Sequence, residues 1–165
     1  MADEPIDSST ELPEAKEPPL GVQSGRVDSA GRLKLSVEVE RFLRGEKLFI
    51  TSLDDGLTAK IYLVPVWQKN EELLSNDFED PDGSEDILIR ANYWGGRAEV
   101  DKEGRVLLPA ALRRKMGVEG QQVVMTHRDQ TITAYSLPYW EERNQGASQD
   151  FATKVRAKKL KGLRV

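Results

Sequence analysis

The chain has 165 residues, of which 38% are hydrophobic and 32% are charged, enough apolar material for one domain or for two small units that share a core. It has no cysteine and a single histidine, which excludes disulfides, thiolate catalysis, cysteine-bound zinc and histidine metal clusters. Because the net charge is −4, any binding to nucleic acid requires a local basic surface.

The N-terminal residues 1–20 form an acidic leader. They hold six acidic side chains, one lysine and four prolines, with little that is apolar. This composition predicts disorder. The leader lacks the basic and apolar regions of a signal peptide, and no window of the chain approaches the roughly 18 apolar residues of a membrane span. We therefore expect neither secretion nor a membrane partner.

The chain contains an internal repeat. Residues 27–32 read V-D-S-A-G-R and residues 100–105 read V-D-K-E-G-R, an offset of 73. At the same offset, residues 60–67 and 133–140 share a tyrosine, a proline and a tryptophan. Shared motifs that keep the same offset although the loops between them differ in length indicate duplication of one structural unit. We place the two copies at roughly 22 to 75 and 95 to 145.

Each copy begins with a predicted β-hairpin. In a D-x-x-G turn the aspartate accepts backbone N–H groups, and the glycine adopts a positive φ that other residues resist. A helix follows in each copy, over residues 37–44 and from residue 110 to 116, and each ends near a glycine. A second strand pair comes next, residues 48–52 with 57–63 and residues 123–127 with 131–135. A Pro-x-Trp segment then opens a short helix, which Trp67 or Trp140 docks onto the core.

The predicted fold is mainly β with short helices, built from two repeats of the order β-β-α-β-β-α. Four short strands cannot hide both faces of a sheet, so the two copies should interleave into one closed, pseudo-twofold barrel. The expected divisions are the leader 1–20, a first repeat 21–76, a linker and helix 77–94, a second repeat 95–145 and a basic tail 146–165.

The arginine of each D-x-x-G-R motif is the main candidate for binding. An arginine at the base of a tight turn can present its planar guanidinium to a phosphate or to the edge of a guanine, while the aspartate braces the turn. The alternative is that Asp28 with Arg32, and Asp101 with Arg105, form only exposed ion pairs, each worth less than about 1 kcal/mol. The residues alone leave both roles open.

Taken together, these motifs resemble the MraZ family. The resemblance rests on the two D-x-x-G-R hairpins, the L-P-x-x-L-R run that ends at Arg113, the Pro-x-Trp segments and the linker 90–96, and it spans about residues 22–145. MraZ proteins are bacterial transcriptional regulators of the cell-division and cell-wall gene cluster. Each half of the chain also resembles the AbrB-type swapped-hairpin DNA-binding domain.

The resemblance implies a cytoplasmic, nucleoid-associated regulator that controls its own gene. It further implies ring-shaped homo-oligomers, double-stranded DNA with repeated sites as the partner, no cofactor, no catalytic residue and no metal site. The residues expected to contact DNA lie in the two hairpins. They are Arg32, Arg105, Asp28, Asp101, Gly31, Gly104, Lys34 and Lys102.

The sequence departs from the family pattern in four places, one of which is the long acidic leader in place of a short start. Ser36 stands where the family usually has a proline, and Ala30 stands where a lysine is common. Glu103 places an acid beside a turn that is expected to face phosphate. We therefore expect the second hairpin to be the less favourable DNA contact electrostatically.

The sequence also bears on two other functions. An enzyme would need a base, nucleophile or metal set, and the chain offers only scattered carboxylates, so we expect no enzymatic activity. The same barrel could instead serve as an antitoxin-like or assembly module that binds a protein. Residues 154–165 carry six basic side chains and no acidic one. Such a tail is a nucleic-acid arm, a ribosome or membrane contact, or a solvated terminus.

Overall fold

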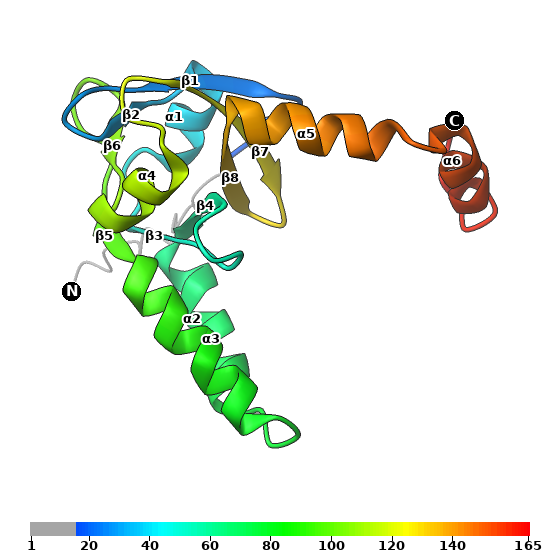
Figure 1. Cartoon of the computed structure of the whole chain (residues 1–165), viewed down its shortest axis with the longest axis horizontal. Helices are drawn as coiled ribbons and strands as arrows, with labels where there is room; N and C mark the ends of the chain where they lie inside the picture. Colours follow the sequence, from blue (N-terminus) through cyan, green and yellow to red (C-terminus); the bar gives the residue numbers. More distant parts are fainter. Residues whose placement is uncertain (1–15) are drawn as a thin grey trace, which may run out of the picture.

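The computed structural model describes residues 16–165, so most of the predicted leader 1–20 lies outside the described residues. A small barrel carries two helical projections, one formed by α2 and α3 and one by α5 and α6 (Figure 1). The first half contains β1 (Gln23–Val27), β2 (Arg32–Lys34), α1 (Val37–Leu43), β3 (Leu48–Thr51), β4 (Thr58–Leu63), α2 (Val64–Ser75) and α3 (Pro81–Trp94). The second half contains β5 (Gly96–Ala98), β6 (Arg105–Leu107), α4 (Ala110–Met116), β7 (Gln122–Arg128), β8 (Thr131–Ser136), α5 (Leu137–Ser148) and α6 (Phe151–Lys159).

The two halves repeat one order of elements. Each runs β-β-α-β-β-α, as the repeat in the sequence predicts, and each is followed by one further helix, α3 or α6. The predicted fold class, mainly β with short helices, is confirmed.

The two repeats interleave within one antiparallel sheet, whose strand order is β5-β3-β4-β8-β7-β1-β2-β6. Strand β1 of the first repeat pairs with β7 of the second, where Gln23 lies opposite Met125. Conversely, β5 pairs with β3, and β2 pairs with β6 with Leu33 opposite Val106. The two end strands, β5 and β6, are consecutive in the chain, so the sheet curls into a nearly closed barrel.

The barrel encloses a single hydrophobic core. Strand residues that alternate inward bury their side chains together with the apolar faces of α1 and α4. Both repeats contribute to this core, so neither can form it alone. Its largest fully buried side chains include Leu33, Leu43, Ile50, Ile61, Val106, Leu108, Leu112, Met125 and Ile132.

Helices α1 and α4 begin differently, and this explains one departure from the family pattern. The Ser36 hydroxyl caps α1 by accepting the backbone N–H of Val39 at 3.3 Å. At the equivalent position of α4, Pro109 makes no side-chain cap. A serine at this point satisfies one of the free N–H groups of the first helical turn, so a helix can begin here without proline.

The two projections differ in how they are packed. Helix α3 folds back on α2, and the buried Thr51 hydroxyl donates to the Ala91 carbonyl of α3 at 2.6 Å. A second apolar cluster forms there around Trp67, which is 4% exposed. By contrast, α5 and α6 contain no buried residue, and α6 makes a helix of the basic segment. The predicted core role therefore holds for Trp67, whereas Trp140 is only half-buried.

Candidate nucleic-acid interface

The first candidate hairpin joins β1 to β2 through a tight turn. The Asp28 carboxylate accepts the backbone N–H groups of Ala30 at 2.9 Å and Arg32 at 3.0 Å, and it also accepts Arg32 Nε at 3.2 Å. Gly31 closes the turn at a φ of 84°, a conformation that favours glycine. The aspartate thus braces both the turn and the guanidinium.

The second candidate hairpin joins β5 to β6 through the same kind of turn, but its two strands do not pair with each other as β1 and β2 do: β5 pairs with β3, and β6 pairs with β2. The predicted hairpin of the second repeat is therefore a turn between strands that pair with the first repeat. The Asp101 carboxylate accepts the backbone N–H groups of Glu103 and Arg105, both at 2.9 Å, and lies 3.4 Å from Arg105 Nε. Gly104 has a φ of 73°. The two D-x-x-G-R motifs therefore form the same aspartate-braced turn.

The two hairpins lie against each other. The Leu35 N–H donates to the Gly104 carbonyl at 3.0 Å, and the Leu108 N–H donates to the Gly31 carbonyl at 3.0 Å. Each turn glycine is thus held by the strand end of the other repeat. This reciprocal pair of hydrogen bonds fixes the spacing of the two turns.

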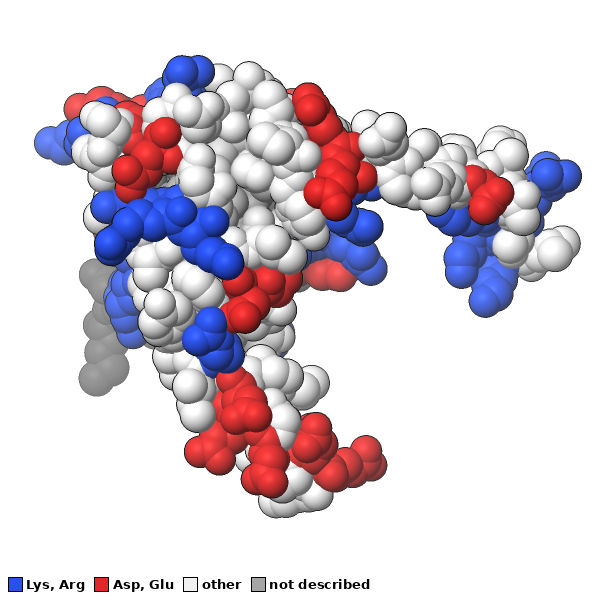
Figure 2. Space-filling model, in the orientation of Figure 1, with Lys and Arg blue, Asp and Glu red and all other residues white. Residues whose placement is uncertain are grey.

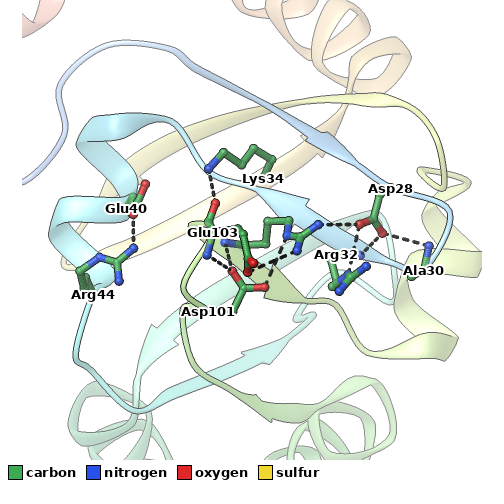
Figure 3. A network of polar contacts seen from close by, with 9 residues as sticks. Asp28, Ala30, Arg32, Lys34, Glu40, Arg44, Asp101 and Glu103 are labelled. Atoms are coloured by element: carbon green, nitrogen blue, oxygen red, sulfur yellow. Dashed lines mark hydrogen bonds and ion pairs between the residues drawn. The ribbon is translucent and has the colours of Figure 1, made fainter.

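Carboxylates surround the arginine of the second hairpin on three sides. Arg105 lies 3.6 Å from Asp28 of the other hairpin, 3.4 Å from Asp101 and 3.4 Å from Glu103. Lys34 donates to the backbone carbonyl of Glu103, so a side chain of the first hairpin also reaches the second turn (Figure 3). Arg32 differs, since Asp28 is its one ion-pair partner within residues 16–165.

A shallow groove of about 630 Å³ follows the paired hairpins. Its basic side chains outnumber its acidic ones, so it has a local positive balance on a chain that is acidic as a whole. A groove with such a balance raises the local concentration of an anionic ligand. The basic lining residues are Arg26, Arg32, Lys34 and Arg105, and the acidic ones are Asp28 and Glu103.

Different charged side chains lie beside the glycines of the two turns. A Cβ at Gly31 would meet the Arg113 side chain of α4, whereas a Cβ at Gly104 would meet both the Glu40 carboxylate of α1 and the Lys34 ammonium. Arg113 and Glu40 occupy equivalent positions of the two repeats. Glu40 is itself paired with Arg44 (Figure 3). The first turn thus has a basic side chain behind it, and the second has an acidic and a basic one.

The predicted site residues fall into two groups. Seven of the eight belong to the hairpin network described above, and Lys102 stands exposed at the tip of the second turn without a hydrogen bond or ion pair to the described part of the chain. Sequence reasoning missed Arg26, Glu40 and the position of Arg113 beneath the first turn. The offset of 73 relates Glu40 to Arg113, but only the fold shows that each lies under the opposite turn.

Hydrogen bonding lowers the pKa of both turn aspartates below their ordinary value of 3.8. For Asp28 the largest cause is the backbone N–H of Arg32, and for Asp101 it is the backbone N–H of Arg105. A carboxylate that accepts such bonds is favoured in its ionised form. The resulting stabilisation is complete above the ordinary pKa and is lost as the pH falls through the lowered values.

We therefore expect acid to weaken the hairpins. Replacing both aspartates, Asp28→Asn with Asp101→Asn, should lower the thermal unfolding midpoint at neutral pH and flatten its decline between about pH 5 and pH 2. Melting curves followed by circular dichroism across this range test the expectation. An equally steep decline in the double variant would show that the two carboxylates do not contribute.

The described residues 16–165 also bear on metal binding, membrane insertion and the single histidine. No group of acidic or histidine side chains there is arranged to hold a metal ion, and this includes the acidic run at residues 77–86. No helix in the described range is long and apolar enough to cross a membrane. The half-buried His127 on β7 packs edge-on against Phe42, with ring centroids 5.2 Å apart.

Fold and site together define a class of protein: a barrel of two interleaved swapped-hairpin repeats that presents a matched pair of D-x-x-G-R turns. The family model described as "MraZ protein, putative antitoxin-like" matches residues 97–161. The transcriptional regulator MraZ of Acidobacterium capsulatum is 41% identical over 102 residues, which cover 60% of this chain and 69% of that protein. The protein of the same name from Koribacter versatilis is 30% identical over 104 residues, covering 61% and 70%.

The chain belongs to the MraZ family. A longer alignment joins it to the transcriptional regulator MraZ of Heliobacterium modesticaldum, 29% identical over 134 residues that cover 80% of this chain and 90% of that protein. These relatives are named as regulators and not as enzymes, in agreement with the expectation from the sequence.

Proposed function

We propose that the protein binds double-stranded DNA through its two D-x-x-G-R hairpins and regulates transcription in this way. The observation that carries the proposal is the side-by-side pairing of the two turns along one groove with four basic side chains. The names of its relatives support the same function.

The arginines retain capacity to bind a ligand despite their ion pairs. A guanidinium has five N–H donors. Asp28 engages Arg32 through Nε, and the Arg32 side chain is 42% exposed. Its terminal nitrogens are therefore available to a phosphate or to the O6 and N7 of guanine. In this role the aspartate positions the guanidinium, so the ion pair and the DNA contact are compatible.

One chain is expected to bind DNA weakly. A module with so few basic side chains has non-specific dissociation constants of roughly 10⁻⁴ to 10⁻⁶ M at physiological salt. A homo-oligomer on repeated sites makes later contacts intramolecular and raises avidity by about 10² to 10⁴. Repeats spaced near one helical turn, about 10 to 10.5 base pairs, place successive hairpin pairs on one DNA face.

A fluorescence anisotropy titration at several salt concentrations tests the proposal. The duplex is the region upstream of the protein's own gene, and the control is a scrambled duplex of equal length. Binding through phosphates should weaken steeply with salt. Inserting five base pairs between repeats should also weaken it, because the second site then faces away. Binding that is absent at low salt would reject the proposal.

Glu103 should act as an internal competitor for DNA. Its carboxylate lies 3.4 Å from Arg105, and its side chain is 66% exposed, so a phosphate approaching Arg105 must displace it. Glu103→Gln should therefore raise the affinity for DNA and steepen its dependence on salt. The same titration measures both effects, and Glu38→Gln is the matched control, since Glu38 is exposed and lies outside the groove. Equal gains in the two variants would show that only overall charge matters.

A protein partner is the alternative function, favoured by the antitoxin-like description of the matching family model. An interface built on apolar contacts would not lose affinity steeply with salt. The salt series therefore separates the two functions.

A further inference from the structure

We propose that residues 1–15 of the acidic leader dock in the groove along the two D-x-x-G-R turns of their own chain and compete there with DNA. This contact regulates the DNA site of the proposed function and rests on that function. It is a property of this chain in particular, since the long acidic leader is one of its departures from the family pattern.

The leader has the charge of a ligand for this groove. Residues 1–15 hold five acidic side chains and no basic one, so all 24 basic side chains of the protein lie in residues 16–165. The groove is lined by four basic side chains and two acidic ones, and the exposed Lys102 adds a positive charge at the tip of the second turn. Runs of acidic residues are often interaction segments, and complementary charge favours their contact with a basic surface. The acidic residues are Asp3, Glu4, Asp7, Glu11 and Glu14.

The described part of the chain begins beside the groove. Lys16 donates to the backbone carbonyl of Arg44, and its Nζ lies 3.3 Å from Glu46 Oε1. The Arg44 side chain pairs with Glu40, whose carboxylate lies against Gly104 of the second turn. Figure 3 shows Arg44 and Glu40 next to the polar network of the two turns. The leader therefore joins the barrel only a few side-chain contacts away from the groove.

Residues 1–15 are long enough to lie along the groove. An extended chain spans about 3.3 to 3.6 Å per residue, so a few residues bridge the gap and the rest can follow the turns. A segment tethered this close has an effective concentration on the order of millimolar. An intrinsic dissociation constant of about 0.1 mM would then leave the groove free in roughly one chain in ten, which lowers the apparent affinity for DNA about tenfold.

The basic tail is the other positively charged surface that the leader could bind, and its position disfavours it. Lys16 contacts the end of α1 on the barrel, whereas α6 lies at the far end of the projection that it forms with α5 (Figure 1). Figure 2 shows the basic side chains of α6 at this extremity, away from the barrel. The groove is therefore the nearer target.

Carbodiimide cross-linking of the full chain without DNA tests the contact. The reagent joins a carboxylate to a lysine amine where the two touch, and mass spectrometry of the digest identifies the pair. We expect cross-links from residues 1–15 to Lys34 or Lys102, and we expect DNA from the region upstream of the gene to suppress them. Cross-links that reach only the lysines of residues 154–165, or neither lysine of the turns, would overturn the inference.

Isotope labelling shows whether the leader binds its own chain. Chains labelled with nitrogen-15 and unlabelled chains are unfolded, mixed and refolded together before cross-linking. A contact within one chain gives cross-linked peptide pairs of a single isotope. Pairs of mixed isotope would place the leader on a neighbouring copy and would contradict the intramolecular contact.

Neutralising the leader should raise the affinity for DNA about tenfold at low salt, because the groove is then free in every chain. The affinity of this variant should also fall more steeply with salt, since salt releases the leader of the wild type and partly offsets its loss of DNA contacts. The anisotropy titration measures both effects. The five substitutions are Asp3→Asn, Glu4→Gln, Asp7→Asn, Glu11→Gln and Glu14→Gln.

The matched control removes five negative charges from the region of α2 and α3, outside the groove. The side chains chosen are exposed and make no ion pair within residues 16–165. This control should bind DNA as the wild type does, and a gain equal to that of the leader variant would show that only overall charge matters. Its substitutions are Glu71→Gln, Glu72→Gln, Glu79→Gln, Glu85→Gln and Asp86→Asn.

The cross-linking and the titration can fail separately. Cross-links from the leader to the turn lysines, with no DNA binding by any variant, would reject the proposed function and leave the leader contact in place. DNA binding that the neutral leader does not strengthen would reject the competition and leave the proposed function in place.

Discussion

Replacing Arg32 and Arg105 together by alanine should abolish most of the specific affinity for DNA. Each bidentate contact to a base is worth about 1 to 3 kcal/mol, and the two arginines hold equivalent places in the paired turns. Thermal stability should change little, because an exposed ion pair such as Asp28–Arg32 contributes less than about 1 kcal/mol. Anisotropy titrations of the variant with operator DNA measure the loss.

The single variants should differ in a definite order. Asp28, Asp101 and Glu103 all lie near Arg105, whereas Arg32 has one ion-pair partner in the described range, so Arg32→Ala should cost more affinity than Arg105→Ala. The matched control is Arg128→Ala, whose side chain is 90% exposed at the β7–β8 turn outside the groove. If the double variant bound as tightly as this control, the hairpins would not be the DNA site.

Leu33→Ala should produce the largest loss of stability. Leu33 is fully buried on β2 opposite Val106 of the second repeat, and truncating such a side chain costs about 2 to 5 kcal/mol. Because both repeats share one core, the chain should still unfold in a single transition with a lower midpoint. Chemical denaturation followed by tryptophan fluorescence measures both quantities.

The matched control for this variant is Leu107→Ala on β6. Leu107 is 55% exposed, so the same truncation should cost far less. Two separate unfolding transitions in Leu33→Ala, or equal losses in the two variants, would contradict a core shared between interleaved repeats.

The sequence predicts the repeating elements well because their determinants are local. Each signal specifies the structure of only a few neighbouring residues. These signals are the D-x-x-G-R turns, the glycines that follow α1 and α4, and the Pro-x-Trp segments that begin helices. Because the second repeat matches the first at a fixed offset, elements predicted in one repeat can be assigned to the other. The interleaving also follows, since neither copy has enough strands to bury a sheet alone.

Contacts between the repeats could not be predicted in the same way. Arg113 lies under Gly31 and Glu40 lies under Gly104 only because β2 pairs with β6, a register that neither segment encodes by itself. The half-exposed state of Trp140 has a similar origin. Its own segment matches that of Trp67, and the difference arises from where α3 and α6 lie.

Directed cleavage of DNA from the hairpin tips tests the central claim most directly. Because the chain has no cysteine, one introduced thiol at Ser29→Cys or Lys102→Cys can carry an iron chelate that cleaves nearby DNA. Both positions are exposed at the turns, and Asn144→Cys on α5 serves as the control. We expect localised cuts within each repeated site from the two turn positions and none from the control. Cuts from Asn144 alone, or none from either turn, would contradict DNA binding by the paired hairpins.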